Sequence, residues 1–316
     1  MVVGDVPMAA GVFFLNSCDF FEKDIYIEDE VLYNSVKTSN KLSDIDFMVN
    51  IMTRTISKSM AGILEDLELD NKTYVTLEDL TELAKRHDVS TEPSLIASRL
   101  KKSGWLLPTS QRGVWEFASA SMAGPYSKND PLMDIKAFKL LNPDIECYVC
   151  LQTAAWVLGL ADRVPAHKEL AFSQIPRKQI PESVNAYKYS PTIPIRDVRG
   201  VSCLAPESII VHIATKPDLV QSWESVMEWL PDVVYEAEIM NLLSEISDRN
   251  DSIKRRTGYL LQGMYPDASD AIYNSIPKPT SKIRFGARKQ SIRNDEKWKV
   301  SDTSLPFSTK EMEKVK

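Results

Sequence analysis

A small, polar and basic helix face is the clearest chemical signal in this sequence. In the predicted helix from Pro93 to Ser103, Ile96 and Leu100 share the side that faces the core, and Leu95 and Arg99 flank it. At about 100° per residue, the opposite side holds Ser94, Ala97, Ser98, Lys101 and Lys102. A helix in the major groove of DNA needs small polar side chains at base edges and cations at phosphates. We therefore predict DNA contacts from four of these residues, namely Ser94, Ser98, Lys101 and Lys102.

Another basic side chain, Arg112, lies in the turn-forming run Pro108–Gly113. The flanking stretches, Trp105–Leu107 and Val114–Phe117, are rich in aromatic or branched residues and predict the two strands of a β-hairpin. Near the hairpin tip, Arg112 can reach a phosphate or a narrow minor groove, so it joins the predicted DNA contacts. The aromatic residues expected to pack the hairpin onto the helices are Trp105, Trp115 and Phe117.

The end of the chain is its most basic part. The whole chain has a net charge of −6, yet residues 277–316 hold 11 basic and 5 acidic residues. Five cations lie within twelve residues with no acidic residue among them, namely Lys282, Arg284, Arg288, Lys289 and Arg293. A buried cation needs water or a partner, so we expect some of them to face solvent or an anionic surface. Arg288 and Lys289 are the candidate DNA contacts here, and a solvated basic tail is the alternative.

The sequence offers no motif for catalysis. It contains no Gly-rich phosphate loop, no Gly-x-Ser-x-Gly and no His-Glu-x-x-His. Asp232, Glu236 and Glu238 follow a helical pattern, which favours a solvated face over a nuclease metal site. Cys147 and Cys150 form a Cys-x-x-Cys, but two further ligands at zinc spacing are lacking, so we expect both to act as small apolar residues. The sequence therefore predicts no catalytic residue, no cofactor and no metal.

The elements that position the basic helix are also readable. Thr76 and Asp79 have the spacing of a capping box at a helix start, and Gly104 can end the following helix in a left-handed conformation. A further helix is expected from Phe47 to Leu67. Helix, helix-turn-helix and hairpin in this order are typical of a winged helix-turn-helix. Winged helices also serve as protein-interaction modules, and residues 53–117 hold 9 basic against 10 acidic residues, which lowers non-specific affinity for DNA. The residues expected on the apolar side of the first of the two turn-linked helices are Leu77, Leu80, Leu83 and Ala84.

The remaining pattern predicts an α+β chain, with an N-terminal winged helix-turn-helix and a larger mixed α+β C-terminal domain. We expect an acidic leader at 1–46, the winged domain at 47–117, a linker at 118–125 and the C-terminal domain with a basic tail at 126–316. No stretch is long and apolar enough to span a membrane, no signal peptide is evident, and four cysteines fit a reducing cytoplasm. In the C-terminal domain, helices are expected at 130–141, 147–160, 206–215, 219–229, 236–246, 252–262 and 268–276, and strands at 169–173, 186–189, 192–197, 201–204 and 282–285.

An ordered set of segments resembles the AbiEi-like family, the antitoxins of type IV toxin–antitoxin systems. Each segment alone is common, and their order makes the resemblance specific. It covers about residues 73–300 and leaves the first ~50 residues outside. The segments that carry it are Thr73–Leu80, Arg99–Leu106, Arg112–Phe117, Thr153–Leu160, Ala205–Thr215 and Lys254–Leu261.

The resemblance implies a DNA-binding transcriptional repressor that is not an enzyme. Such an antitoxin binds inverted repeats in its own promoter and neutralises a nucleotidyltransferase-like toxin encoded beside it. By analogy, DNA recognition falls to Ser94, Ser98, Lys101, Lys102 and Arg112. Two alternatives stay open: a nuclease-like effector with a winged-helix targeting domain, and a plain winged-helix regulator. Phage defence and plasmid maintenance are both compatible with the family.

Overall fold

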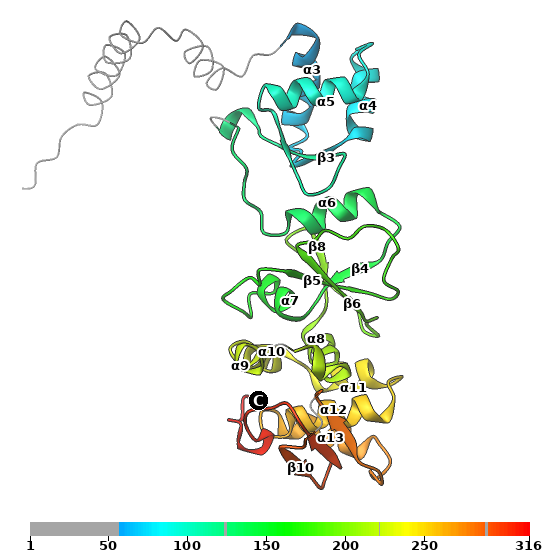
Figure 1. The fold of residues 1–316 in the computed structure, drawn as a ribbon, viewed down its shortest axis with the longest axis vertical. Helices are drawn as coiled ribbons and strands as arrows, with labels where there is room; N and C mark the ends of the chain where they lie inside the picture. The colour runs from blue at the N-terminus through cyan, green and yellow to red at the C-terminus, as the bar shows by residue number, and fades with distance from the viewer. Residues whose placement is uncertain (1–56, 123–124, 221, 288–289) are drawn as a thin grey trace, which may run out of the picture. The chain divides into compact units, whose positions relative to one another are not determined.

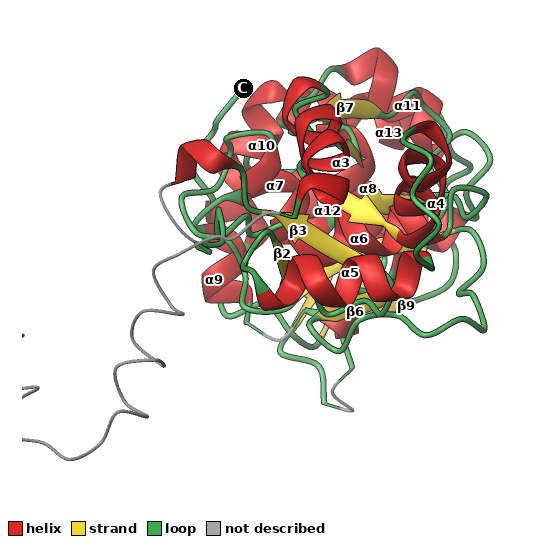
Figure 2. Ribbon diagram, turned by 90° about the horizontal axis from the view of Figure 1, so that it is seen from above, coloured by secondary structure: helices red, strands yellow, loops and turns green. Residues whose placement is uncertain are grey.

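The computed structural model describes residues 57–316, except for 123–124, 221 and 288–289, and Lys58–Lys316 form one unit. The expected leader, and the expected helix as far as residue 56, lie outside the described residues. Helices and strands both occur throughout the described part, as Figures 1 and 2 show, so the α+β class is confirmed.

The first six described elements build a small layer of helices on a three-stranded sheet. The sheet is antiparallel with the order β1-β3-β2, and Val75 of β1 pairs with Trp115 of β3. Its core joins residues from all three helices, among them the buried Ile63, Leu80 and Ile96. The elements are α3 (Lys58–Leu69), β1 (Tyr74–Thr76), α4 (Leu77–Arg86), α5 (Pro93–Lys102), β2 (Leu106–Pro108) and β3 (Val114–Phe117).

Local sequence signals explain where α4 and α5 begin and end. The Thr76 side chain accepts a hydrogen bond from Asp79 N, and the Asp79 carboxylate accepts one from Thr76 N, so the predicted capping box is confirmed. Gly104, just past α5, has the expected positive φ of 74°. The prediction for Leu77 was wrong: at the first position of α4 its side chain is 43% exposed, because that position precedes the turn that packs on the core. Ala97 is also corrected, since it is 3% exposed and its small side chain lies in the core.

A five-stranded mixed sheet forms the centre of the next part of the chain. Its order is β6-β5-β4-β8-β7, with β5–β6 and β4–β8 parallel and the other pairs antiparallel. The expected helix at 147–160 is wrong at its start, because residues 147–149 pair with neighbouring strands and the helix begins only at Leu151. The elements are η1 (Ala120–Met122), α6 (Met133–Leu141), β4 (Cys147–Val149), α7 (Leu151–Val157), β5 (Lys168–Phe172), β6 (Val184–Lys188), β7 (Arg196–Val198) and β8 (Val201–Cys203).

Helix α8 is the central element of the larger core. Residues 206–214 are all buried, which fits a helix that is apolar almost all round and packs against α7, α10, α11 and α12. The expected helix at 236–246 is corrected: α10 ends at Glu236 and α11 begins at Ile239. The elements are α8 (Pro206–Thr215), η2 (Pro217–Leu219), α9 (Trp223–Met227), α10 (Leu230–Glu236), α11 (Ile239–Ile246), α12 (Asp251–Leu261) and α13 (Pro266–Asn274).

The basic end of the chain is part of the fold and is not a free tail. Phe285, Trp298 and Leu305 are fully buried in the larger core. Arg293 does not project as an unpaired cation, because it donates hydrogen bonds to the carbonyl oxygens of Leu305 and Phe307, each at 2.9 Å. The last elements are β9 (Ile283–Phe285), β10 (Arg293–Asp295), β11 (Val300–Asp302) and η3 (Thr309–Glu311), and the sheet order is β10-β11-β9.

Candidate nucleic-acid interface

The outer face of α5 gathers the polar residues that the sequence singled out. Ser94, Ser98, Lys101 and Lys102 are all exposed on this one helix. Helices α4 and α5 pack on each other, and the buried residues of α5, which include Ile96 and Leu100, hold its inner side in the core. The structure therefore brings these four residues together on a rigid element.

The charge on this face is not neutralised locally. Helix α5 contains no acidic residue, and its last turn holds Arg99, Lys101 and Lys102. None of these three cations forms an ion pair with a described residue. Cations near a helix C-terminus also stabilise the helix dipole by about 0.3–1 kcal/mol, so a structural contribution exists besides any ligand. The uncompensated charge nevertheless suits a phosphate backbone.

Two residues belong to this face although the sequence placed them only at its flank. Leu95 is 53% exposed, and Arg99 is exposed without an ion-pair partner among the described residues. An exposed apolar side chain of this kind can contact a thymine methyl group, and an Arg can pair with guanine. The sequence already indicated that these residues share one face, because Arg99 lies three residues before Lys102 and four after Leu95, and such positions are neighbours on a helix.

The hairpin residue Arg112 lies on another surface. It is exposed and lines a cleft together with Glu78 of α4, Leu140 of α6 and Pro143, and no described α5 residue lines that cleft. The turn of the hairpin is held in place, because Ser110 Oγ donates a hydrogen bond of 2.5 Å to Asp134 Oδ1 of α6. Arg112 is thus presented separately from the α5 residues.

The other predicted contacts lie near the end of the chain. Arg288 and Lys289 are outside the described residues. Their neighbours Lys282 and Arg284 are exposed, at and beside strand β9.

The described part of the chain does not bring the candidate metal-binding residues together in a site. Asp232, Glu236 and Glu238 are exposed, and the described residues hold no group of three or more His, Cys, Asp or Glu side chains that could bind a metal ion. Cys147 and Cys150 are buried, and burial raises the pKa of each thiol, which fits their predicted role as small apolar residues. None of the described helices is both long and apolar enough to cross a membrane.

Comparison with known proteins gives one domain match and one similar fold. Residues 147–263 match the AbiEi antitoxin C-terminal domain, a family that is regulatory rather than catalytic. The fold resembles the crystal structure of RV2827C protein from Mycobacterium tuberculosis, with a TM-score of 0.63 and 22% identity over 80% of this chain and 94% of that one. At this identity the likeness concerns the fold alone. No curated protein matches the chain.

The matched segment includes the two parallel strand pairs of the five-stranded sheet and helices α7 to α12, the centre of the larger core. It also contains the segments Thr153–Leu160, Ala205–Thr215 and Lys254–Leu261, which carried the resemblance in the sequence. Over residues 147–263, the chain therefore resembles the AbiEi antitoxin C-terminal domain.

Proposed function

We propose that the protein is a DNA-binding antitoxin whose residues 58–117 form a winged helix-turn-helix. In this assignment α4 and α5 are the helix-turn-helix, α5 is the recognition helix, and the β2–β3 hairpin is the wing. The observation that carries the proposal is the outer face of α5, which holds Ser94, Ser98, Arg99, Lys101 and Lys102 without an acidic residue on the helix.

The proposal assigns separate tasks to the groups on this face. Ser94 and Ser98 have short side chains and lie before the last turn of α5, Ser94 in the first turn and Ser98 one turn later, and the N-terminal part of a recognition helix reaches base edges. Lys101 and Lys102 are longer and lie in its last turn, where they contact phosphates. Arg112, Arg288 and Lys289 would add phosphate contacts outside α5. The DNA is the promoter of the chain's own operon, with an inverted repeat, because the family implies autorepression.

The C-terminal domain, in the same proposal, neutralises a nucleotidyltransferase-like toxin. The support is the match of residues 147–263 to the AbiEi antitoxin C-terminal domain. We also propose a cytoplasmic location, together with a role in phage defence or in plasmid maintenance, both of which are compatible with the family.

The test is DNA binding by a double variant, Lys101→Ala with Lys102→Ala, measured by fluorescence anisotropy on the upstream promoter DNA. Both side chains are exposed, so the fold should survive, and the affinity should fall. The slope of log K against log salt should become shallower by about one per lost phosphate contact. An affinity and a slope equal to those of the unmodified protein would refute the assignment of α5.

A matched control carries the same change in charge elsewhere. Lys278 and Lys314 are exposed and have no ion-pair partner among the described residues. The double variant Lys278→Ala with Lys314→Ala should bind promoter DNA almost as the unmodified protein does. An equal loss in both double variants would mean that only overall charge matters. Further variants, Arg112→Ala and Arg288→Ser with Lys289→Ser, test the proposed contacts outside α5 in the same assay.

A further inference from the structure

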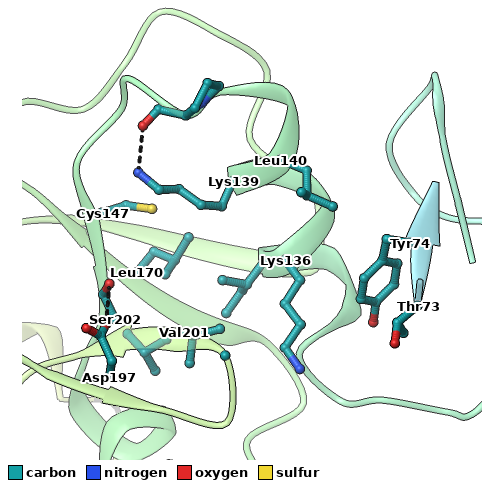
Figure 3. Close-up of a pocket in the computed structure, with 14 residues that line it drawn as sticks. Thr73, Tyr74, Lys136, Lys139, Leu140, Cys147, Leu170, Asp197, Val201 and Ser202 are labelled. Atoms are coloured by element: carbon teal, nitrogen blue, oxygen red, sulfur yellow. Dashed lines mark hydrogen bonds between the residues drawn. The ribbon is translucent and has the colours of Figure 1, made fainter. Parts of the chain in front are cut away.

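A cavity of about 700 Å³ lies between α6 and the five-stranded sheet. Ligand pockets in proteins commonly enclose about 300–1,000 Å³, so its size suits a small molecule. Figure 3 shows the lining, in which α6 forms one side and strands of the sheet the other. Its apolar floor consists of side chains that are themselves buried, namely Ile135, Cys147, Val149, Leu170 and Val201.

Two lysines of α6 give this apolar cavity a positive side. The charge of Lys136 is compensated by an ion pair, because its Nζ lies 2.7 Å from Asp130 Oδ2. The charge of Lys139 is not: its Nζ donates to the carbonyl oxygens of Pro143 at 3.0 Å and Ile145 at 2.7 Å, and it forms no ion pair with a described residue. An ammonium has three protons to donate, so Lys139 retains one after these two bonds.

The charge of Lys139 acts on the cavity itself. In Figure 3 the Lys139 side chain runs past Cys147, on the side of α6 away from Tyr74. It opposes the rise in the pKa of the Cys147 thiol that burial causes. The carboxylate on the opposite wall, Asp197, accepts a hydrogen bond of 2.9 Å from Ser202 Oγ. An anionic group is therefore favoured beside Lys139 and disfavoured beside Asp197.

We propose that this cavity binds a small carboxylate with an apolar body, whose carboxylate pairs with Lys139 while its body lies on the floor formed by Val149, Leu170 and Val201. A partly desolvated ammonium gains more from an anion than an exposed one does, because the local dielectric is lower. The apolar body gains free energy from the surface it removes from water. Both parts of the ligand are thus specified by the lining.

The site also touches the DNA-binding half of the chain. Thr73 and Tyr74 close one side of the cavity, and Tyr74 belongs to β1, which leads directly into α4. Tyr74 Oη donates to Asp130 Oδ2 at 3.1 Å, the same oxygen that pairs with Lys136. Binding of a carboxylate in this cavity does not depend on the proposed DNA binding and can be measured without DNA.

The test is isothermal titration calorimetry, which measures the binding of 3-phenylpropionate, of its uncharged counterpart 3-phenylpropan-1-ol and of inorganic phosphate to the full chain. The carboxylate should bind with an affinity about tenfold higher, the effect of one charge-assisted hydrogen bond. In Lys139→Met this preference should vanish, whereas Lys139→Arg should retain it. The matched control is Lys178→Met, which removes an exposed lysine that does not line the cavity and should leave the preference unchanged.

A second variant covers the case in which Lys139→Met fails to fold. Val201→Phe leaves every charge in place and fills part of the cavity, so it should weaken both organic probes together. Equal affinity for the acid and the alcohol would overturn the proposed role of Lys139. Inorganic phosphate binding as tightly as 3-phenylpropionate would overturn the role of the apolar floor. No heat of binding with any probe at millimolar concentration would overturn the proposal as a whole.

Discussion

Arg255 shows how a single buried cation can hold distant parts of this chain together. It is 5% exposed, and its guanidinium donates to the carbonyl oxygens of Trp298, Ser281 and Lys299 at 2.7–2.9 Å. These bonds tie α12 to the turn before β11 and to the segment before β9. The rigid guanidinium carries five N–H donors spread over three nitrogen atoms, whereas a Lys carries three on a single nitrogen, so Lys cannot reach the same set of carbonyl groups. Arg255 lies in a segment that resembles the family, and its role in the structure is to stabilise the fold.

We therefore expect Arg255→Lys to lower the free energy of unfolding by about 2–4 kcal/mol, since several buried carbonyl groups lose their donors. Urea denaturation followed by circular dichroism would measure the change. Lys278→Met, at an exposed position, is the control and should stay within about 0.5 kcal/mol of the unmodified protein. A similar small effect for Arg255→Lys would show that water satisfies these carbonyl groups.

Glu169 gives a prediction about pH. Its carboxylate accepts hydrogen bonds from Thr153 N at 2.9 Å and Thr153 Oγ1 at 3.2 Å, and burial raises the pKa of Glu169 to about 7 from 4.5. A carboxyl whose pKa is raised in the fold favours the folded state most below pH 4.5. That contribution is lost as the pH rises to about 7.

Glu169→Gln should therefore remove part of the pH dependence of stability. Between pH 4.5 and 7 the unmodified protein should lose on the order of 2 kcal/mol more of its unfolding free energy than the variant does. Urea titrations at several pH values would show it. Parallel pH curves for the two proteins would mean that Glu169 ionises in the fold as it does in water.

At the scale of elements, the sheet β1-β3-β2 packs on the helices more through Trp105 than through Trp115. The sequence assigned a packing role to Trp105, Trp115 and Phe117 together. Trp105 is 5% exposed and stacks on Phe117 with ring centroids 6.4 Å apart, whereas Trp115 is only half-buried. The packing prediction is thus confirmed in full for the first and the last of these residues.

Trp105→Ala should lower the unfolding free energy of residues 58–122 by about 3–5 kcal/mol, the usual cost of deleting a buried tryptophan. Trp115→Ala should cost clearly less, because part of its ring already contacts solvent. Thermal melting of both variants gives the comparison. The reverse order of the two melting temperatures would show that the hairpin packs on the helices through Trp115.

Gly258 illustrates a conflict between a helix and its neighbours. In the middle of α12, replacing Gly by Ala would gain about 1 kcal/mol of helix propensity. A Cβ at this position, however, would lie 2.0 Å from the ring of Trp298, which is fully buried and in edge-to-face contact with Tyr273. The cost of this clash exceeds the gain in helix propensity. The glycine is therefore needed because it allows α12 to lie close to the residues before β11.

We expect Gly258→Ala to destabilise the protein by at least about 1–3 kcal/mol, the usual cost of overpacking a core. Gly258→Ala combined with Trp298→Phe should recover part of the loss, because the smaller ring vacates the contact. Denaturation of both variants would measure the recovery. A more stable Gly258→Ala protein would indicate that Trp298 moves aside without cost.

On the scale of the whole molecule, two hydrophobic cores suggest two separable activities. One core draws on residues 60–117 and the other on residues 132–315. If the proposed function holds, a fragment of residues 126–316, co-expressed with the proposed toxin, should restore growth without binding promoter DNA. A fragment of residues 47–122 should bind the promoter and leave the toxin active.

Growth assays and anisotropy measurements on the same two fragments would decide the matter. Rescue only by proteins that bind DNA would mean that repression accounts for the whole antitoxin effect. Double variants of the full chain at Lys101 and Lys102 provide the control, since they should lose promoter binding and keep rescue. This control separates the two activities even where a fragment folds poorly.

The sequence by itself determined the elements whose signals are local. The capping box at Thr76, the positive φ of Gly104 after α5, and the bounds of α8 at residues 206–215 depend on neighbours a few residues away, and each was predicted correctly. The exposed cations of α5 follow from helical periodicity in the same way. Such features need no knowledge of the rest of the chain, because one helical turn already specifies which side is buried.

Only the tertiary structure decided features that depend on contacts distant in sequence. Residues 147–149 form a strand because β5 and β8 pair with them, although their apolar run equally suits a helix. Arg293 is bound to carbonyl groups twelve and fourteen residues away, so it is not the solvated cation that its charged neighbours suggested. The cavity beside Lys139 likewise exists only where α6 and the strands meet. Backbone pairing and long side chains join segments whose proximity no local pattern encodes, and that is the physical reason for the difference.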